Sequence, residues 1–301
     1  MLPFSRLLCF ESEDEGKAKY FADLGVEATV LPEPGTPIQA YSSFNDLIAG
    51  KDKVTATVGK VYTGFLLWDF MDLKQLPSCT MLTQLDGGIL ASSTTSTLNI
   101  PANPPLWTKP AAALAAPEED IHMSRYCASN FPDWEGELVF VTSKVCRDVS
   151  PKDAESYILG YTIGNDLSCR VFQLPAQNGG QFFYAKAFDK FAPIGPVLVS
   201  AEVIQQSEEV KIVTKVNGEV MQDADVKKDM VFSPAQILSF MSQSTTIPAY
   251  TAVMTGTPAG VGAFKSPRRF LSHEDVVDIQ ITGIGVLRNR ILFPEGKQAV
   301  L

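Results

Sequence analysis

The sequence predicts an α+β protein in which strands predominate and pack as mixed sheets. Two antiparallel strand pairs in the second half of the chain support this prediction. The first is a hairpin over Val210–Val220, whose Asn217-Gly218 dipeptide is favoured in two-residue loops. The second joins Val276–Thr282 to Val286–Phe293 through the glycines at Gly283–Gly285. Helix signals are few by comparison, so strands should make up most of the core.

The first 80 residues predict a small N-terminal domain. Three short strands are expected before a proline-rich break at residues 32–37, namely Phe4–Phe10, Lys17–Leu24 and Val26–Leu31. Ser42 or Ser43 caps a short helix that runs through Ile48. The apolar stretch Val54–Leu76 fits either a helix or a strand. We place a domain boundary near Pro77–Thr80, which gives domains of residues 1–80 and 81–301.

Two helices are marked by capping signals in the larger domain. Ser150 as the N-cap, Pro151 at the first helical position and Asp153 predict a helix that ends at Gly160. A second capped helix begins at Ser233 and turns an apolar face inward. Between them, Tyr161–Leu167 reads as a strand that carries Asp166.

Composition excludes several classes of partner. The chain has 301 residues, a net charge of −9 and no apolar run near the roughly 18 residues of a membrane span. Nucleic acid and anionic membranes attract basic surfaces, so neither is expected as a partner. The five cysteines are scattered and form no C-x-x-C pair. Reduced thiols in the cytoplasm or an organelle matrix are therefore expected.

Only two histidines are present, His122 and His273. A histidine-rich metal site is excluded, and catalysis through a Ser-His or Cys-His pair is severely limited. His122 lies upstream of an acidic strand and is the candidate for an acid or base role. The alternative is a surface histidine without a catalytic role.

That acidic strand is the main candidate site. The apolar run Leu138–Val141 predicts a buried strand. Because side chains alternate along a strand, Glu135 and Glu137 should point to the same face. Two neighbouring carboxylates near a core need a cation or hydrogen-bond donors, and a hard divalent ion such as Mg²⁺ takes oxygen ligands of this kind. The alternative is an exposed strand end with two solvated glutamates.

Four stretches in order resemble the fumarylacetoacetate hydrolase superfamily, and the resemblance covers nearly the whole chain. They are Asp133–Leu138, Gly160–Arg170, Lys186–Asp189 with Pro193–Pro196, and Thr255–Gly262. The resemblance implies twisted mixed β-sheets that form a β-roll around a metal site, behind a small N-terminal domain, in a protein that is usually a homodimer. It implies Mg²⁺ or Mn²⁺ bound by Glu135, Glu137 and Asp166, a ligand set that suits a hard ion.

The resemblance also implies a small-molecule substrate, a 1,3-dicarbonyl or a 2-oxo acid, that becomes an enolate when a bond breaks. The metal would act as a Lewis acid, and Lys186 would support the negative charge as a catalytic residue. Arg170, Gln173 and Thr257 match positions that contact the substrate.

The chain departs from the family at one important place. A His-x-x-Glu pair upstream of the equivalent of Thr108-Lys109-Pro110 usually activates water, but no histidine precedes His122 here. The corresponding positions fall near Ser92 and Thr95, whose hydroxyls cannot serve as a base near neutral pH. The cluster Ser92–Thr97 is expected to form a flexible or remodelled lid.

These observations predict a divalent-metal-dependent enzyme that stabilises an enolate and carries out C–C bond cleavage or decarboxylation. A keto–enol tautomerase, an isomerase or a cyclase of a specialised biosynthetic pathway is the first alternative. A catalytically silent, metal-stabilised binding protein is the second.

Overall fold

The computed structural model describes residues 3–14, 17–28, 30–61, 80–83 and 101–294. Within these ranges the fold is α+β, with mixed sheets and mostly short helices, as the sequence predicts. No helix in the described part of the chain is both long and apolar enough to cross a membrane. The proposed division near residues 77–80 stays a prediction, because residues 77–79 lie outside the described ranges.

An eleven-stranded sheet forms the larger layer. Its main path runs in the order β3-β4-β1-β13-β11-β10-β16-β5-β6, with β2 added beside β1 and β7 beside β13. The strands are β1 (Arg6–Ser12), β2 (Lys19–Asp23), β3 (Pro37–Ala40), β4 (Val54–Val61), β5 (Thr80–Thr83), β6 (Leu106–Lys109), β7 (Leu114–Ala115), β10 (Gly136–Thr142), β11 (Ile158–Asn165), β13 (Ala192–Val199) and β16 (Ala252–Met254).

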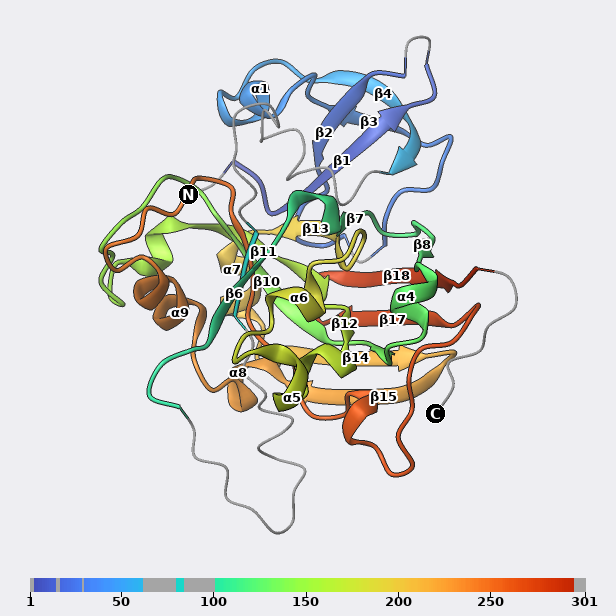
Figure 1. Ribbon diagram of the computed structural model, residues 1–301. Coiled ribbons are helices and arrows are strands. Elements are labelled where there is room, and N and C mark those ends of the chain that lie inside the picture. The colour runs from blue at the N-terminus through green and yellow to red at the C-terminus, as the bar shows by residue number, and fades with distance from the viewer. Residues whose placement is uncertain (1–2, 15–16, 29, 62–79, 84–100, 295–301) are drawn as a thin grey trace.

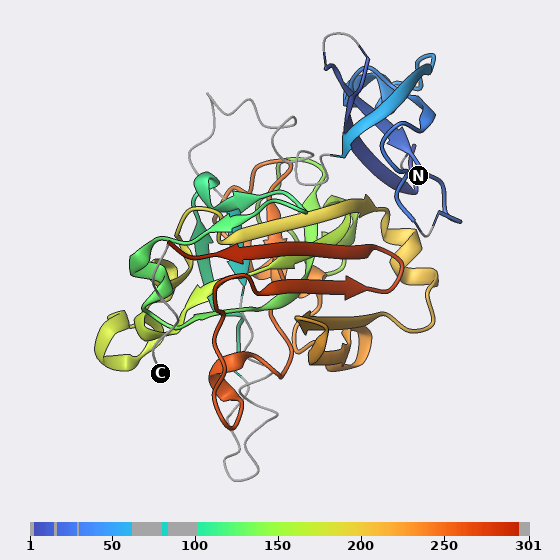
Figure 2. The same cartoon turned by 90° about the vertical axis from the view of Figure 1, so that its right-hand side faces the viewer.

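A five-stranded sheet packs against this layer. Its order is β15-β14-β17-β18-β8, and β9 and β12 pair with each other as a separate two-stranded sheet. The strands are β8 (Ile121–His122), β9 (Pro132–Asp133), β12 (Ser168–Cys169), β14 (Lys211–Val216), β15 (Glu219–Asp225), β17 (Val276–Ile281) and β18 (Gly285–Leu292). Figure 1 shows β14, β15, β17 and β18 side by side, and Figure 2 shows β1–β4 in blue at one end of the molecule.

Helices are short and lie at the margins of the sheets. The α-helices are α1 (Phe44–Ile48), α4 (Arg125–Ala128), α5 (Pro175–Asn178), α6 (Phe183–Lys186), α7 (Ala201–Gln206), α8 (Val226–Asp229) and α9 (Pro234–Met241). The 3₁₀ helices are η1 (Ala111–Ala113), η2 (Ala154–Tyr157), η3 (Arg170–Gln173) and η4 (Gly262–Phe264).

Apolar side chains pack on both faces of β10, which explains why the sequence of this strand is continuously apolar. Leu138 and Phe140 pack with Ile212 and Ile279 of the five-stranded sheet. Val139, on the opposite face of β10, packs in a second apolar cluster that includes residues from the N-terminal strands. Every residue of β10, β11 and β13 is buried, as expected for strands that are covered on both faces.

Several elements form where the sequence predicts them. Asn217 and Gly218 have positive φ angles of 52° and 82°, and they connect β14 to β15 in the predicted hairpin. Ser43 caps α1 by accepting a hydrogen bond from Asp46 N. Ser233 and Gln236 form a complete capping box at the start of α9. The last two predicted strands are β17 and β18.

Two predicted elements are wrong. Residues 26–28 form a turn and irregular chain, so Val26–Leu31 is not a strand, and β3 and β4 complete the N-terminal strands instead. The predicted helix Ser150–Gly160 is reduced to the 3₁₀ turn η2, because Ile158 already begins β11. Asp153 N does donate to Ser150 Oγ at 3.3 Å, but this hydrogen bond closes a turn, and η2 begins only after Asp153. Ile158–Gly160 pair with β10 and enter the buried sheet, which outweighs one local hydrogen bond.

Candidate metal and substrate site

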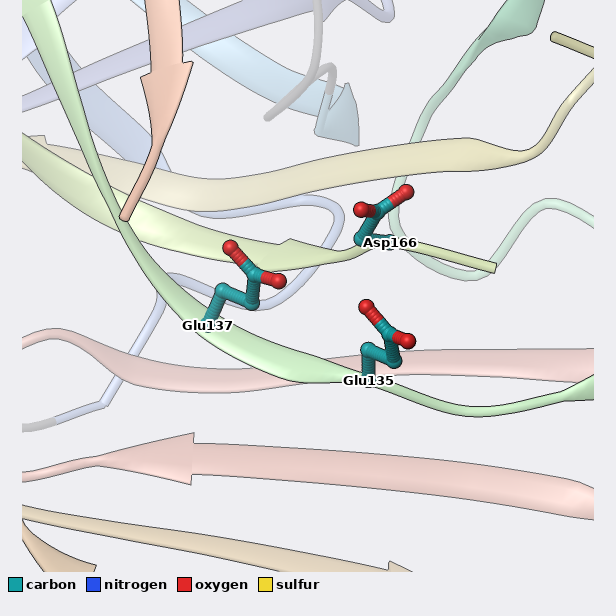
Figure 3. Close-up of side chains that lie close together, drawn as sticks. All are labelled: Glu135, Glu137 and Asp166. Atoms are coloured by element: carbon teal, nitrogen blue, oxygen red, sulfur yellow. The ribbon is translucent and has the colours of Figure 1, made fainter. Parts of the chain in front are cut away.

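Three carboxylates meet where β10 and β11 pair. Glu137 lies in β10, Glu135 directly precedes that strand, and Asp166 directly follows β11. The antiparallel register sets Gly136 opposite Asn165, and Asp166 N donates a hydrogen bond to Glu135 O at 2.9 Å. One oxygen from each carboxylate lies within 4.8 Å of the others, and Figure 3 shows the glutamates on one side of β10 with Asp166 across from them. All three residues are at most 1% exposed.

Glu137 is the least compensated of the three. Its Oε2 accepts a hydrogen bond from Gly256 N at 2.7 Å, but its buried Oε1 has no hydrogen-bond partner among the described residues. Burial, and then the negative charges of Asp166 and Glu135, raise the pKa of Glu137 well above its ordinary value. An unsatisfied carboxylate oxygen beside two other carboxylates is a position that a hard cation would stabilise.

Lys186, the last residue of α6, neutralises part of this charge. Its Nζ lies 2.8 Å from Glu135 Oε2 and 2.6 Å from Asp166 Oδ2, and it donates to Ser168 Oγ at 2.8 Å. Burial opposes the lysine charge, but the carboxylates of Asp166 and Glu135 outweigh burial and raise the pKa of Lys186. This side chain is therefore a buried cation at the carboxylates.

A second buried lysine, Lys109 at the end of β6, was not identified as a site residue from the sequence. Its Nζ lies 2.6 Å from Asp166 Oδ1, and it donates to three backbone carbonyls, those of Leu167, Lys186 and Phe191. Burial lowers its pKa to about 8, against the opposing effect of the Asp166 charge. The only signal in the sequence was a lysine inside the short strand Leu106–Lys109, followed by a proline.

Arg170 connects the carboxylates to the neighbouring loops. It opens η3, donates from Nη1 to Glu135 Oε1 at 2.5 Å and to Gln173 Oε1 at 2.8 Å, and donates from Nε to Asp133 Oδ2 at 2.8 Å. Asp133 is fully buried and accepts hydrogen bonds from the backbone N–H groups of Gly262 and Ala263. Asp133 was not identified as a site residue from the sequence. The arginine and Gln173 are thus brought to the cluster together.

Thr257 lies in the loop Thr255–Gly262 that packs against β10. Its hydroxyl donates to Gly136 O at 3.0 Å and accepts from Gln222 Nε2 at 2.7 Å. Both the hydroxyl hydrogen and one acceptor position are therefore used within the protein. The structure places this threonine beside the backbone that carries the two glutamates.

His122 is not brought to the cluster. It lies exposed on β8, opposite Leu292 of β18 in the parallel pairing, near the charge of Asp120. Ser92 and Thr95, together with the lid expected at Ser92–Thr97, lie outside the described residues. The alternative of two solvated glutamates at an exposed strand end is wrong, because Glu135 and Glu137 are fully buried.

The three carboxylates fit a divalent cation. They offer oxygen ligands only, and Glu137 Oε1 has no hydrogen-bond partner in the part of the chain that the structure describes; such donor sets are preferred by Mg²⁺ and Mn²⁺. Glu135, Glu137 and Asp166 therefore form a candidate metal site, in which Lys109, Lys186 and Arg170 contact both oxygens of Glu135 and both oxygens of Asp166.

Comparisons with known proteins point to one family. The family described as fumarylacetoacetate (FAA) hydrolase C-terminal matches residues 85–292. A mitochondrial oxaloacetate tautomerase of Bos taurus is 35% identical over 193 residues, which cover 64% of this chain and 60% of that protein. Oxaloacetate tautomerase YisK of Bacillus subtilis is 38% identical over 196 residues, 65% of this chain and 64% of that protein. The chain thus matches less than two thirds of each relative's length.

Solved structures agree with this fold over almost the whole chain. A fumarylacetoacetate hydrolase from Exiguobacterium antarcticum superposes with a TM-score of 0.70 at 24% identity, and covers 96% of this chain and all of that one. A 2-hydroxyhepta-2,4-diene-1,7-dioate isomerase from Mycobacterium marinum has a TM-score of 0.66 at 28% identity, and covers 97% of this chain and all of that one.

Proposed function

Because this chain belongs to the fumarylacetoacetate hydrolase family, we propose that it is a divalent-metal-dependent enzyme that interconverts the keto and enol forms of a small 2-oxo acid such as oxaloacetate. One observation carries the proposal: Lys186, a buried cation, lies within 2.8 Å of two members of the Glu135, Glu137 and Asp166 cluster. This arrangement concentrates positive charge where an enolate would form.

The choice of reaction rests on where the two histidines of the sequence lie among the described residues. Hydrolysis needs a base that activates water, and histidine is the side chain most often used for this purpose. The sequence has only two histidines, His122 and His273. His122 is exposed on β8, and the nitrogen Nδ1 of His273 accepts a hydrogen bond from Phe293 N. Tautomerisation moves one proton from C3 of the oxo acid to the carbonyl oxygen on C2, without activation of water. The names of the Bos taurus and Bacillus subtilis relatives support this choice.

In our proposal the residues of the site have separate roles. A divalent cation held by Glu135, Glu137 and Asp166 would polarise the 2-oxo group. Lys186 holds a positive charge beside the developing enolate oxygen and stabilises it electrostatically. Arg170 and Gln173 would contact the substrate. The planar guanidinium of Arg170 suits a substrate carboxylate, and Gln173 Oε1 accepts a hydrogen bond from that guanidinium.

Thr257 and its loop complete the site in this proposal, since they lie against the glutamate strand. The catalytic role predicted for His122 stays a prediction, and its substitution by alanine tests it. A homodimer and a location in the cytoplasm or an organelle matrix also stay predictions. Light scattering on the purified protein and microscopy of a tagged chain would test them.

The first experiment follows enol absorbance of oxaloacetate in the ultraviolet, with pyruvate and bicarbonate assayed in parallel. We expect metal-free protein to be inactive, Mg²⁺ or Mn²⁺ to restore enol–keto exchange, and Glu135→Ala to remain inactive with either ion. The exposed variant Glu208→Gln should match the unaltered protein. Release of pyruvate at the rate of enol loss would instead identify decarboxylation. Bound metal without any conversion of a panel of 2-oxo acids and 1,3-diketones would favour the silent binding protein.

A further inference from the structure

Gln222 of β15 reaches from the five-stranded sheet to the candidate metal site. It is 1% exposed, and its side-chain amide makes three hydrogen bonds. Its Oε1 accepts from Gly136 N at 3.0 Å, and its Nε2 donates to Thr257 Oγ1 at 2.7 Å and to Pro258 O at 2.8 Å. One side chain therefore joins β15, the start of β10 and the loop Thr255–Gly262.

Chemistry fixes the direction of each of these hydrogen bonds. Gly136 N–H can only donate, so the atom that faces it must be the amide oxygen of Gln222. Pro258 O can only accept, so the atom that faces it must be the amide nitrogen. Thr257 Oγ1 consequently accepts from Nε2, which leaves its own hydrogen free to donate to Gly136 O at 3.0 Å. Gly136, Gln222 and Thr257 thus form a closed ring of three hydrogen bonds.

The ring holds the one residue that separates the two glutamates. Both backbone polar groups of Gly136, its N–H and its carbonyl, are bound within the ring. A Cβ atom on Gly136 would lie 2.2 Å from Thr214 Oγ1 and 3.2 Å from Gln222 Oε1, so the backbone of β10 approaches the second sheet as closely as glycine allows.

The same ring holds the loop that binds Glu137. Thr257 follows Gly256, whose N–H donates to Glu137 Oε2 at 2.7 Å. Gly260 of this loop has a φ of +112°, and a Cβ atom there would lie 2.0 Å from Met221 O, so the loop also packs on the backbone of β15. The ring therefore holds the backbone of Gly136, which lies between Glu135 and Glu137, and it also holds the loop whose Gly256 N–H donates to Glu137.

We propose that Gln222 is a positioning residue for the carboxylate site, acting through Gly136 and Thr257 without contact to the metal or the substrate. The proposal rests on the proposed metal-dependent function, and it extends that function to a residue in the second sheet. Partners of this kind, outside the ligand set, commonly change metal affinity by about 10- to 100-fold when they are lost.

The test measures Mn²⁺ affinity by the electron paramagnetic resonance signal of free Mn²⁺, which requires no turnover. Gln222→Met keeps the length of the side chain but removes both hydrogen-bonding groups, and Thr257→Val removes the hydroxyl at nearly constant shape. We expect each to weaken Mn²⁺ binding by about 10- to 100-fold. Thr257→Ser keeps the hydroxyl and should bind Mn²⁺ like the unaltered protein. Gln280→Met, an exposed change on β17, is the matched control and should also bind normally.

The double variant Gln222→Met/Thr257→Val separates a ring from two independent contacts. Either single change already breaks the ring. The Mn²⁺ affinity of the double variant should therefore lie within about twofold of the affinity of the weaker-binding single variant. Multiplied losses in the double variant would overturn the ring. If Gln222→Met does not fold, the comparison of Thr257→Val with Thr257→Ser decides the same question.

A merely structural role for Gln222 makes a different prediction. It would lower the melting temperature of Gln222→Met without changing Mn²⁺ affinity or the ratio of kcat to KM, and that result would overturn the proposal. Failure of the proposed function is recognised separately, by Mn²⁺ binding in the unaltered protein without conversion of any oxo acid. In that case the Mn²⁺ affinities of the variants would still test whether Gln222 positions the carboxylates.

Discussion

Replacement of Glu137 by glutamine should stabilise the metal-free protein and abolish its stabilisation by metal. Glutamine keeps the shape of the side chain and an oxygen that can accept from Gly256 N, but it removes one negative charge from the buried cluster. The same charge is needed as a ligand for a hard cation. The single change Glu137→Gln therefore acts in opposite directions on the two forms of the protein.

The magnitude follows from the separation of the carboxylates. Two unit charges at 4.8 Å, the upper limit of the oxygen–oxygen distances in this cluster, repel by about 3–4 kcal/mol at an effective dielectric constant near 20. The attraction that Lys186 exerts on Glu137 opposes this repulsion, and the raised pKa of Glu137 lets a proton relieve part of it. We therefore expect a net gain of about 1–3 kcal/mol for Glu137→Gln without metal. Saturating metal at 100 times its dissociation constant should add about 2.7 kcal/mol to the unaltered protein alone.

Urea unfolding at pH 7.5, followed by circular dichroism with EDTA or with Mn²⁺, measures both effects. We expect Glu137→Gln to have the higher midpoint in EDTA, and the midpoint of the unaltered protein alone to rise with Mn²⁺. Glu208→Gln, an exposed change, should follow the unaltered protein under both conditions. A lower midpoint for Glu137→Gln in EDTA would refute the electrostatic reasoning, and an undiminished response to Mn²⁺ would refute the ligand assignment.

Four further predictions can be checked with the same protein. In EDTA the free energy of unfolding should fall as the pH rises from about 4.5 toward neutrality, because folded Glu137 keeps a proton that the unfolded chain releases. Urea titrations at several pH values measure this dependence, and a free energy of unfolding that does not change with pH would contradict the prediction. Lys186→Met should lower kcat by about 10²- to 10³-fold and still bind Mn²⁺ in a titration. Gly136→Ala should cost about 1–3 kcal/mol in urea unfolding, and Thr214→Ala should restore part of that loss, since it removes the oxygen that the new Cβ meets. The acid–base role predicted for His122 requires that His122→Ala lower kcat by about 10²-fold or more, and a kcat within about twofold of the unaltered protein would contradict that role.

Strand alternation and the family resemblance together predicted much of the site. Strand alternation alone placed Glu135 and Glu137 on one face, and the resemblance added Asp166 and Lys186, which lie in contact with this cluster. The hairpin at Asn217-Gly218 and the capping box at Ser233 also formed as the sequence predicts, because each depends on hydrogen bonds between residues two to four positions apart.

Other elements depended on contacts that no local pattern records. The cap at Ser150 predicts a helix, but pairing of Ile158–Gly160 with β10 decided that segment in favour of a strand. Lys109 reads as an ordinary lysine in the sequence, although it is fully buried against Asp166. Its charge is tolerated only because the fold supplies a carboxylate and three carbonyls around it.

The strand-rich fold class and the acidic strand can be predicted from the sequence, because alternation and turn geometry act between neighbours in the chain. The groups that compensate the buried charges, and the ring of Gly136, Gln222 and Thr257 that holds the glutamates in place, come together only when the chain folds. Gln222 is 86 residues from Gly136 and 35 from Thr257. Hydrogen bonds over such separations follow from the packing of two sheets. Periodicity in the sequence indicates which face of a strand is buried, but it does not indicate which distant residues meet there.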